Sequence, residues 1–475
     1  PVSRFFDRIN RPEQLIPSLL NAMRVLTDPA ETGAVTVAMP QDVQAEVFDW
    51  PVEFFRKRVW HVRRPVPEPA ALERAVALIK AAKRPLIIAG GGTIYAGASE
   101  ELRALATATG IPVGDTQAGK GAINFDHPSA VGGVGSTGCD SGNHIADKAD
   151  LIIGVGTRYS DFTTASKTQF KNPDVKFVNI NVTPFDAAKE SAEMVVADAR
   201  EALAALTEAL ADYHVDQAYS DEITAEKEAW LKATERCYHL DHGPLPAQTE
   251  VFGALNELMG EEDVVINAAG SMPGDLQALW QARSPLQYHV EYAFSCMGYE
   301  VPAAMGVKLA RPEAEVVSIV GDGTYQMLPM ELATVVQENI KVIYVLLQNY
   351  GFCSIGALSE SHGSQRFGTK YRQRGEGSHL ADEQVIDGVD IAVNARSWGL
   401  DVLEVHTIEE FKEAYRKAEA SDRPTMIHIE TDLYGPNPPG SSWWDVPVSG
   451  VSALESTQRA YEDYQRDRKP QRHYL

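Results

Sequence analysis

Two short motifs carry residue types that can hold a metal ion against phosphate groups. They are Gly-Asp-Gly at 321–323 and Gln-Asn-Tyr-Gly at 348–351, and each directly follows a run of apolar residues. The carboxylate of Asp322, the amide oxygen of Asn349 and the backbone carbonyl of Gly351 form a set of hard oxygen ligands, which suits Mg2+ that keeps phosphate oxygens as its other ligands. We therefore predict a magnesium site here. The alternative is that Asp322 caps a helix and Asn349 lies in a turn.

The surrounding residues predict the elements that bring these two motifs together. Residues 316–320 and 342–347 are short apolar runs bounded by glycine, a pattern typical of buried strands, and residues 327–339 between them are expected to form one helix. Neighbouring parallel strands end at the same edge of an open sheet, where such sheets bind ligands. The two motifs should therefore lie side by side.

A third segment is expected at the same edge. Residues 264–273 read as a strand that ends in Gly270-Ser271, where small side chains let backbone N–H groups approach a phosphate; an ordinary strand-end turn is the alternative. Gly323 and Thr324 would offer further N–H groups at a helix N-terminus.

Composition limits the class of partner and the cell compartment. The net charge of -23 argues against binding to nucleic acid or to an anionic membrane. No apolar run approaches the ~18 residues that a membrane helix needs, and no signal peptide is visible. The four cysteines have no metal-type spacing, which favours reduced thiols and a cytoplasmic location. They are Cys139, Cys237, Cys296 and Cys353.

Alternating strand and helix patterns predict an α/β protein built from doubly wound parallel sheets. A chain of 475 residues is too long for one core, so about three domains are expected. Because the first strand and helix have nothing to pack against, we expect Pro1 to lie inside a domain whose beginning is missing.

The glycines at 90–92 do not have the spacing of a dinucleotide-binding fingerprint, and we favour a tight turn over a nucleotide site there. The expected division is 1–55 (end of the first domain), 56–213 (central domain), 214–245 (connector), 246–432 (metal- and phosphate-binding domain) and 433–475 (tail).

Over nearly its whole length the chain resembles the thiamine diphosphate enzyme family, and in particular its acetolactate synthase-like branch. The resemblance rests on the two motifs above, on 33–43 and 150–159, and on the stretch 297–306 (Met-Gly-Tyr-Glu-Val-Pro-Ala-Ala-Met-Gly). It implies thiamine diphosphate and Mg2+ as cofactors, with Met297 supporting the bent cofactor. The residues then expected to contact the cofactor are Gly270, Ser271, Met272, Met297, Gly321, Asp322, Gly323, Thr324, Asn349, Gly351 and Phe352.

Signatures at 3–9, 48–52, 56–65 and 440–447 look like one subgroup of the family. Its members are hydrolases of myo-inositol catabolism that open a polyol-derived cyclic 1,2-dione to 5-deoxy-glucuronate. The alternatives are a carboligase acting on pyruvate, which often holds FAD in the central domain, and a cofactor-binding protein without turnover.

The resemblance leaves the catalytic residues open. The family's activating glutamate is expected in the missing first domain, and this implies a homodimer at least, with a homotetramer as an option, because the two halves of each site come from different subunits. His362 is a weak candidate for a base that activates water, and His289 and Glu300 are weaker ones. Tyr299-Glu300 and Gln348 depart from the family pattern, so the shape of the pocket is expected to differ.

Overall fold

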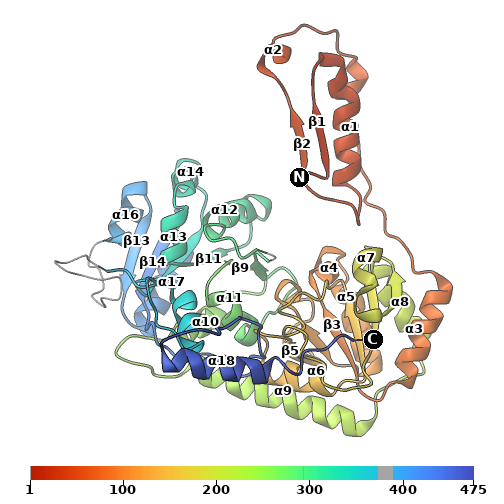
Figure 1. Cartoon of the computed structure of the whole chain (residues 1–475). Coiled ribbons are helices and arrows are strands. Elements are labelled where there is room, and N and C mark those ends of the chain that lie inside the picture. The colour runs from red at the N-terminus through yellow and green to blue at the C-terminus, as the bar shows by residue number, and fades with distance from the viewer. Residues whose placement is uncertain (1, 293, 373–388, 475) are drawn as a thin grey trace.

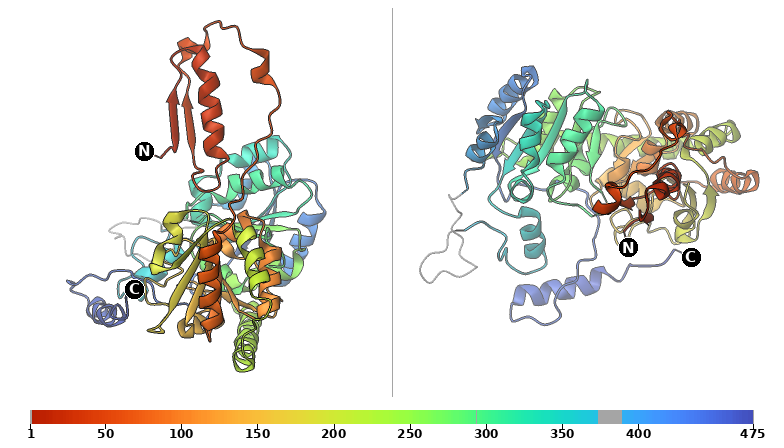
Figure 2. Two further views of the ribbon diagram at one scale, coloured as in Figure 1. Left: turned by 90° about the vertical axis from the view of Figure 1, so that its right-hand side faces the viewer. Right: turned by 90° about the horizontal axis from the view of Figure 1, so that it is seen from above.

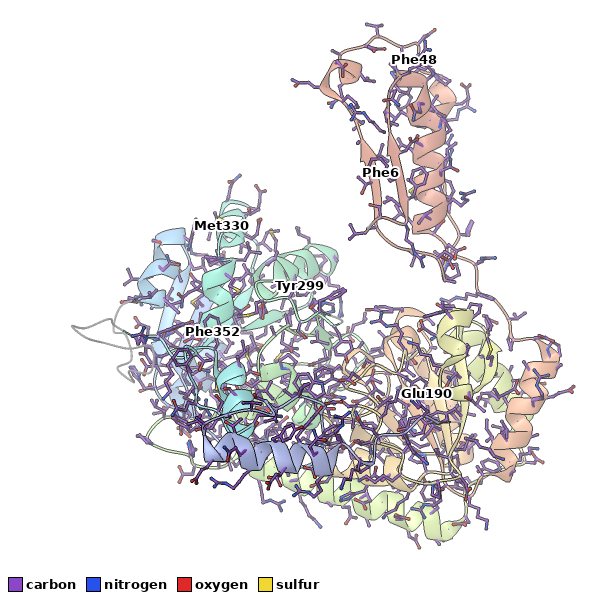
Figure 3. All side chains as sticks on the ribbon, in the orientation of Figure 1. Phe6, Phe48, Glu190, Tyr299, Met330 and Phe352 are labelled. Carbon is purple, nitrogen blue, oxygen red and sulfur yellow. The ribbon has the colours of Figure 1, made fainter. Side chains whose placement is uncertain are left out.

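The computed structural model describes residues 2–292, 294–372 and 389–474. Figure 1 shows two large α/β units side by side and a small N-terminal unit standing above them. The small unit is a strand–helix–strand motif in which the two strands are parallel, with Phe5 opposite Val35. Figure 3 shows Phe6 and Phe48 in this unit, away from both large sheets. Its elements are β1 (Phe5–Arg8), α1 (Leu15–Leu26), β2 (Val35–Ala38) and α2 (Gln41–Gln44).

The central unit contains a six-stranded parallel sheet in the order β5-β4-β3-β6-β7-β8. Its inner strands are runs of apolar residues buried on both faces, as expected for a parallel sheet covered by helices on both sides. The strands are β3 (Pro85–Ala89), β4 (Val113–Asp115), β5 (Ala130–Gly133), β6 (Leu151–Val155), β7 (Lys176–Asn181) and β8 (Glu193–Val196). The helices are α3 (Pro69–Ala81), α4 (Gly91–Tyr95), α5 (Ser99–Thr109), α6 (Asp140–Lys148), α7 (Pro184–Ala187) and α8 (Ala199–Ala209).

The second large unit contains another six-stranded parallel sheet, in the order β10-β9-β11-β12-β14-β13. Two buried hydrophobic clusters, one on each face of this sheet, are formed by side chains from the strands and from the helices that cover them. The strands are β9 (Val264–Asn267), β10 (Tyr288–Val290), β11 (Val316–Gly321), β12 (Ile343–Gln348), β13 (Asp401–Val405) and β14 (Thr425–Glu430). The helices are α10 (Gln248–Leu258), α11 (Met272–Leu279), α12 (Glu300–Ala310), α13 (Asp322–Met327), α14 (Glu331–Gln337), α15 (Cys353–Ser361), α16 (Ile391–Trp398) and α17 (Ile408–Ala420).

One long helix and the C-terminal tail join the two large units (Figures 1 and 2). The helix is α9 (Gln217–Tyr238), which hydrogen-bonds the central unit through Tyr219 and the second unit through Trp230. After α18 (Glu455–Asp467) the tail returns to the central unit, where the buried ring of Tyr474 packs on Phe170 and Phe177. These contacts fix the two large units relative to each other.

The predicted α/β architecture with parallel sheets is confirmed, but the expected single helix over 327–339 is wrong. Helix α13 begins earlier, at Asp322, and ends at Met327; α14 begins only at Glu331. Pro329 explains the break, because proline disfavours helical geometry in the residue before it, and Leu328 has φ -150° and ψ 66°. The earlier start places Asp322, Gly323 and Thr324 in the first turn of α13.

Candidate active site

Three adjacent strands of the second sheet bring the predicted motifs to one edge. Strand β11 pairs with β9 on one side and with β12 on the other, all in parallel. The segment after β9 begins with Ala268, the segment after β11 with Asp322, and the segment after β12 with Asn349. The residues predicted from three separate stretches of sequence therefore meet in space.

Asp322 is buried and is hydrogen-bonded by the backbone that follows β12. Its Oδ2 accepts N–H bonds from Asn349 at 3.2 Å, Tyr350 at 2.6 Å and Gly351 at 3.3 Å. Its Oδ1 accepts the N–H of Gly323 at 2.8 Å. Burial raises the pKa of Asp322 to about 6 in spite of these bonds, because the charged carboxylate has lost its hydration. A cation beside it would favour the charged form.

Asn349 offers an oxygen that the protein does not use. Its Oδ1 is buried and accepts no hydrogen bond from the described residues. A buried acceptor without a partner is costly, so its presence beside a buried carboxylate points to a missing ligand. Within the described ranges, no three His, Cys, Asp or Glu side chains gather into a metal-binding group. One carboxylate, one amide oxygen and one carbonyl are instead a set that fits Mg2+ completed by phosphate oxygens.

The segment that contains Gly351 is held in place by a second stretch of backbone. Gly351 forms a bridge with Lys370, and the N–H of Phe352 donates to the carbonyl of Thr369 at 2.7 Å. The ring of Phe352 lies against Gly323, where an added Cβ would come within 3.0 Å of it. A larger residue at 323 would push into Phe352, so the close approach of these two segments depends on glycine.

The segment after β9 forms a short turn, and some of its side chains are already hydrogen-bonded or packed within the protein. Gly270 has φ +89°, a conformation that glycine adopts easily, and it leads directly into α11. The hydroxyl of Ser271 bonds the side chain of Gln248 at 3.0 Å. Met272 is buried, and its Cε would meet an added Cβ on Gly321 at 3.5 Å. Met272 therefore packs in the core under the site.

Met297 lies half-buried in a turn before α12, and this turn is tied to α13. The N–H of Gly298 donates to Thr324 Oγ1 at 2.6 Å and to Glu300 Oε2 at 3.1 Å. The hydroxyl of Thr324 is also 3.0 Å from Glu300 Oε2. Glu300, only a weak candidate from the sequence, thus lies at the centre of the site; the signal that could have identified it is the replacement of a small residue by a carboxylate inside the motif.

The structure does not bring the two histidine candidates into contact with Asp322. His362 lies at the end of α15, where its Nδ1 is 2.8 Å from the carbonyl of Leu358. His289 is on β10, with Nε2 2.7 Å from the hydroxyl of Tyr299, and burial lowers its pKa. A 90 Å³ cavity beside Asp322 is lined by neither histidine.

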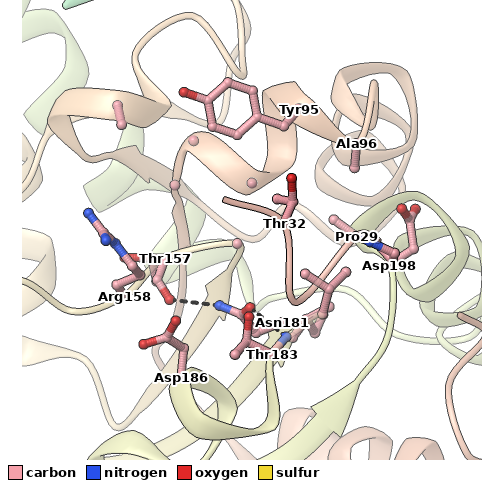
Figure 4. A pocket seen from close by; sticks show the side chains of 18 of the residues that line it. Pro29, Thr32, Tyr95, Ala96, Thr157, Arg158, Asn181, Thr183, Asp186 and Asp198 are labelled. Carbon is pink, nitrogen blue, oxygen red and sulfur yellow. Dashed lines mark hydrogen bonds between the residues drawn. The ribbon is translucent and has the colours of Figure 1, made fainter. Parts of the chain in front are cut away.

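A larger cavity lies elsewhere, at the edge of the central sheet (Figure 4). It measures about 610 Å³ and is bordered by Gly90, Gly91 and Gly92 and by Asn181, Thr183 and Asp186. An added Cβ on Gly90 would lie 2.4 Å from the carbonyl oxygen of Gly156. The glycines permit a close approach of two backbone segments, but Gly91 and Gly92 are the first residues of α4 and do not form the expected tight turn.

Comparison with known proteins agrees with this geometry. Residues 72–206 match the model for the central domain of thiamine pyrophosphate enzymes, and residues 268–429 match that for their C-terminal TPP binding domain. The chain is 44% identical to the 3D-(3,5/4)-trihydroxycyclohexane-1,2-dione hydrolase of Bacillus cereus strain AH820, over 97% of this chain and 75% of that protein. The same figures hold for the hydrolases of that name from Bacillus anthracis strain CDC 684 / NRRL 3495 and from Bacillus thuringiensis strain Al Hakam. The chain therefore belongs to the thiamine pyrophosphate (thiamine diphosphate) enzyme family.

Proposed function

We propose that this protein is a thiamine diphosphate- and Mg2+-dependent hydrolase that opens trihydroxycyclohexane-1,2-dione in myo-inositol catabolism. The observation that carries the proposal is the 44% identity to hydrolases of that name over 97% of the chain. The buried oxygen set at Asp322 and Asn349 supports it, because it is what a magnesium-held diphosphate requires.

Our proposed roles for the site residues follow their positions. Asp322, Asn349 and the carbonyl of Gly351 hold Mg2+. The N–H groups of the first turn of α13 and of the turn after β9 bind the diphosphate. Met297 supports the two cofactor rings, and Met272 and Phe352 pack beside the site. The residues assigned to the diphosphate are Gly270, Ser271, Gly321, Gly323 and Thr324.

The proposed reaction breaks the bond between the two adjacent carbonyl carbons of the ring. The hydroxyl of one water adds to one carbon to give a carboxylate, and the remaining hydrogen goes to the other carbon to give an aldehyde, as in 5-deoxy-glucuronate. Bound thiamine diphosphate supplies a carbon nucleophile and takes up the electron pair that this cleavage releases. The chain's contribution is to fix the diphosphate on a rigid sheet edge, and to exclude water from the buried carboxylate of Asp322.

We further propose a homodimer or homotetramer, a cytoplasmic location and the domain division given above. Four free cysteines support the location. In the part of the chain that the structure describes, no helix is long and apolar enough to cross a membrane. The two separate sheets and the helix α9 between them support the division into central, connector and diphosphate-binding parts.

Product analysis tests the function. Full-length protein is incubated with Mg2+, thiamine diphosphate and either the trihydroxy dione or pyruvate, and the products are identified by mass spectrometry. We expect 5-deoxy-glucuronate from the dione and no acetolactate from pyruvate. Acetolactate as the main product would replace the proposal with a carboligase, and cofactor binding without any product would replace it with a binding protein.

A further inference from the structure

Glu300 is a fully buried carboxylate where the segment after β9, the turn before α12 and the first turn of α13 meet. It is the first residue of α12 and has 0% exposure. Its Oε2 accepts the N–H of Gly298 and lies 3.0 Å from the hydroxyl of Thr324, and the backbone N–H of Ala269 also stabilises its charge. One side chain thus connects the end of β9, the turn before α12 and the first turn of α13.

The hydrogen bonds around Thr324 depend on whether Glu300 carries a proton. A hydroxyl has one proton to donate and two lone pairs with which to accept. Thr324 Oγ1 already accepts the N–H of Gly298 at 2.6 Å. If Glu300 is a carboxylate it can only accept, so it takes the single proton of Thr324. Thr324 then has only a lone pair left to present to a diphosphate oxygen, which is itself an acceptor.

The protonated form of Glu300 removes this conflict. Its O–H can donate to Thr324 Oγ1, which then accepts two bonds, from Glu300 and from Gly298, and is free to donate its own proton outward. We propose that Glu300 is a positioning residue of the cofactor site, which as a carboxylic acid orients the Thr324 hydroxyl proton toward the bound diphosphate. This inference rests on the proposed placement of the diphosphate at Gly323 and Thr324.

The surroundings of Glu300 favour the acid form. Burial raises the pKa of Glu300, and its Oε1 is buried without a hydrogen-bond partner among the described residues. Strands β9 and β11 next to it carry no charged side chain, and Lys308 of α12 is hydrogen-bonded to the carbonyl of Ala314. The titratable side chains on the elements around it are Tyr288, His289, Glu291, Cys296, Tyr299, Lys308, Asp322, Tyr325, Glu331 and Tyr344.

Cofactor binding should therefore take up a proton at Glu300. An anionic diphosphate raises the pKa of a neighbouring carboxyl further, so the bound form holds a proton that the free form has partly lost. Affinity for the cofactor should then fall as the pH rises between the two pKa values, by at most about 10-fold per pH unit. Asp322 must ionise to hold Mg2+, which makes the affinity for the cofactor rise with pH instead. The effect of Glu300 is therefore measured as the difference in pH dependence between the wild type and Glu300→Gln.

Isothermal titration calorimetry of the full-length protein with thiamine diphosphate at saturating Mg2+ tests this between pH 6 and 8.5. Buffers of different ionisation enthalpy report the protons taken up. In Glu300→Gln the amide N–H can donate to Thr324 at every pH, so we expect the affinity of the wild type at low pH, without the proton uptake of the wild type. Glu300→Ala should lose about 10-fold in affinity at every pH. Glu315→Gln is the matched control, since Glu315 is a partly buried carboxyl with a raised pKa that is paired with Lys341, and it should keep the proton uptake of the wild type.

A second variant keeps the test informative if Glu300→Gln folds poorly. Thr324→Val should lose about 10-fold in affinity, and adding Glu300→Gln to it should change the affinity no further. Equal proton uptake and equal pH slopes in the wild type and Glu300→Gln would overturn the inference. If Asp322→Ala also leaves the affinity unchanged, the placement of the site itself is wrong; if Asp322→Ala abolishes binding, only the role of Glu300 is lost.

Discussion

Asn349 and Asp322 should respond differently to truncation, although both are proposed to hold the same metal ion. The carboxylate of Asp322 accepts three backbone N–H groups through Oδ2, whereas Oδ1 of Asn349 accepts none among the described residues. One residue thus has a structural role in addition to metal binding, and the other does not.

The expected size of each effect follows from these bonds. Asp322→Ala removes both oxygens of the carboxylate and so takes the acceptor from four backbone N–H groups, three bonded to Oδ2 and that of Gly323 bonded to Oδ1; at ~1 kcal/mol or more for each donor this costs at least ~4 kcal/mol. Asn349→Ala removes an acceptor that was already unpaired, so the free energy of unfolding should stay within ~1 kcal/mol of that of the wild type. For a unit of this size, 1 kcal/mol corresponds to roughly 2–4 °C in Tm. Without cofactor, Asp322→Ala should melt at least ~8 °C lower than the wild type, and Asn349→Ala within ~4 °C of it.

Thermal melts with and without thiamine diphosphate and Mg2+ measure both effects. A ligand at 100 times its Kd stabilises the wild type by about 2.7 kcal/mol, and both variants should lose this stabilisation. Asn394→Ala is the control: the Oδ1 of Asn394 accepts the hydroxyl of Tyr325 at 2.9 Å, so this variant should lose stability but keep the response to the ligands. Our reasoning is wrong if Asn349→Ala destabilises as much as Asp322→Ala does, or if it still responds to the ligands.

Three further predictions concern other parts of the molecule. Burial raises the pKa of Asp275 from 3.8 to about 7, so the folded state holds a proton that the unfolded chain has lost, and this group's contribution to stability falls as the pH rises from about 4 to about 7. Asp275→Asn should therefore raise Tm relative to the wild type more at pH 8 than at pH 5, and equal changes at both would contradict this. Tyr474→Ala removes a buried ring that packs on Phe170 and Phe177, and should cost ~3–5 kcal/mol in urea denaturation, against ~1 kcal/mol for Tyr474→Phe. His362→Gln should leave kcat for the dione within about threefold, because the structure holds this ring on α15, away from the cavity beside Asp322; a larger loss in steady-state assays would restore it as a catalytic candidate.

Local sequence patterns predicted the elements around the site well. The apolar runs at 316–320 and 342–347 correspond to β11 and β12, each shifted by one residue at one end or at both. Such runs are readable because a strand buried on both faces must be apolar along its whole length. The prediction of one helix over 327–339 was wrong because Pro329 disfavours helical geometry at Leu328, and this local effect interrupts an otherwise helical pattern.

The roles of individual side chains were harder to predict. Met272 is predicted to contact the cofactor; its side chain belongs to the buried cluster on one face of the sheet, and its Cε lies 3.5 Å from an added Cβ on Gly321. The sequence around Glu300 gives little indication of its role, because the residues that contact this carboxylate are not adjacent to it in the chain. Its partners Ala269, Gly298 and Thr324 lie on three different segments.

The sequence by itself determined which residues have side chains suited to a metal ion and, to within about one residue, where β11 and β12 lie, because residue chemistry and strand patterning are local properties. Only the tertiary structure decided that β9, β11 and β12 are neighbours, since strand order depends on how the whole sheet packs. It alone also showed that Asp322 accepts backbone N–H groups while the side-chain oxygen of Asn349 accepts none from the described residues. Hydrogen bonds between distant segments form only when the fold brings donor and acceptor together, and that is a property of the packed molecule.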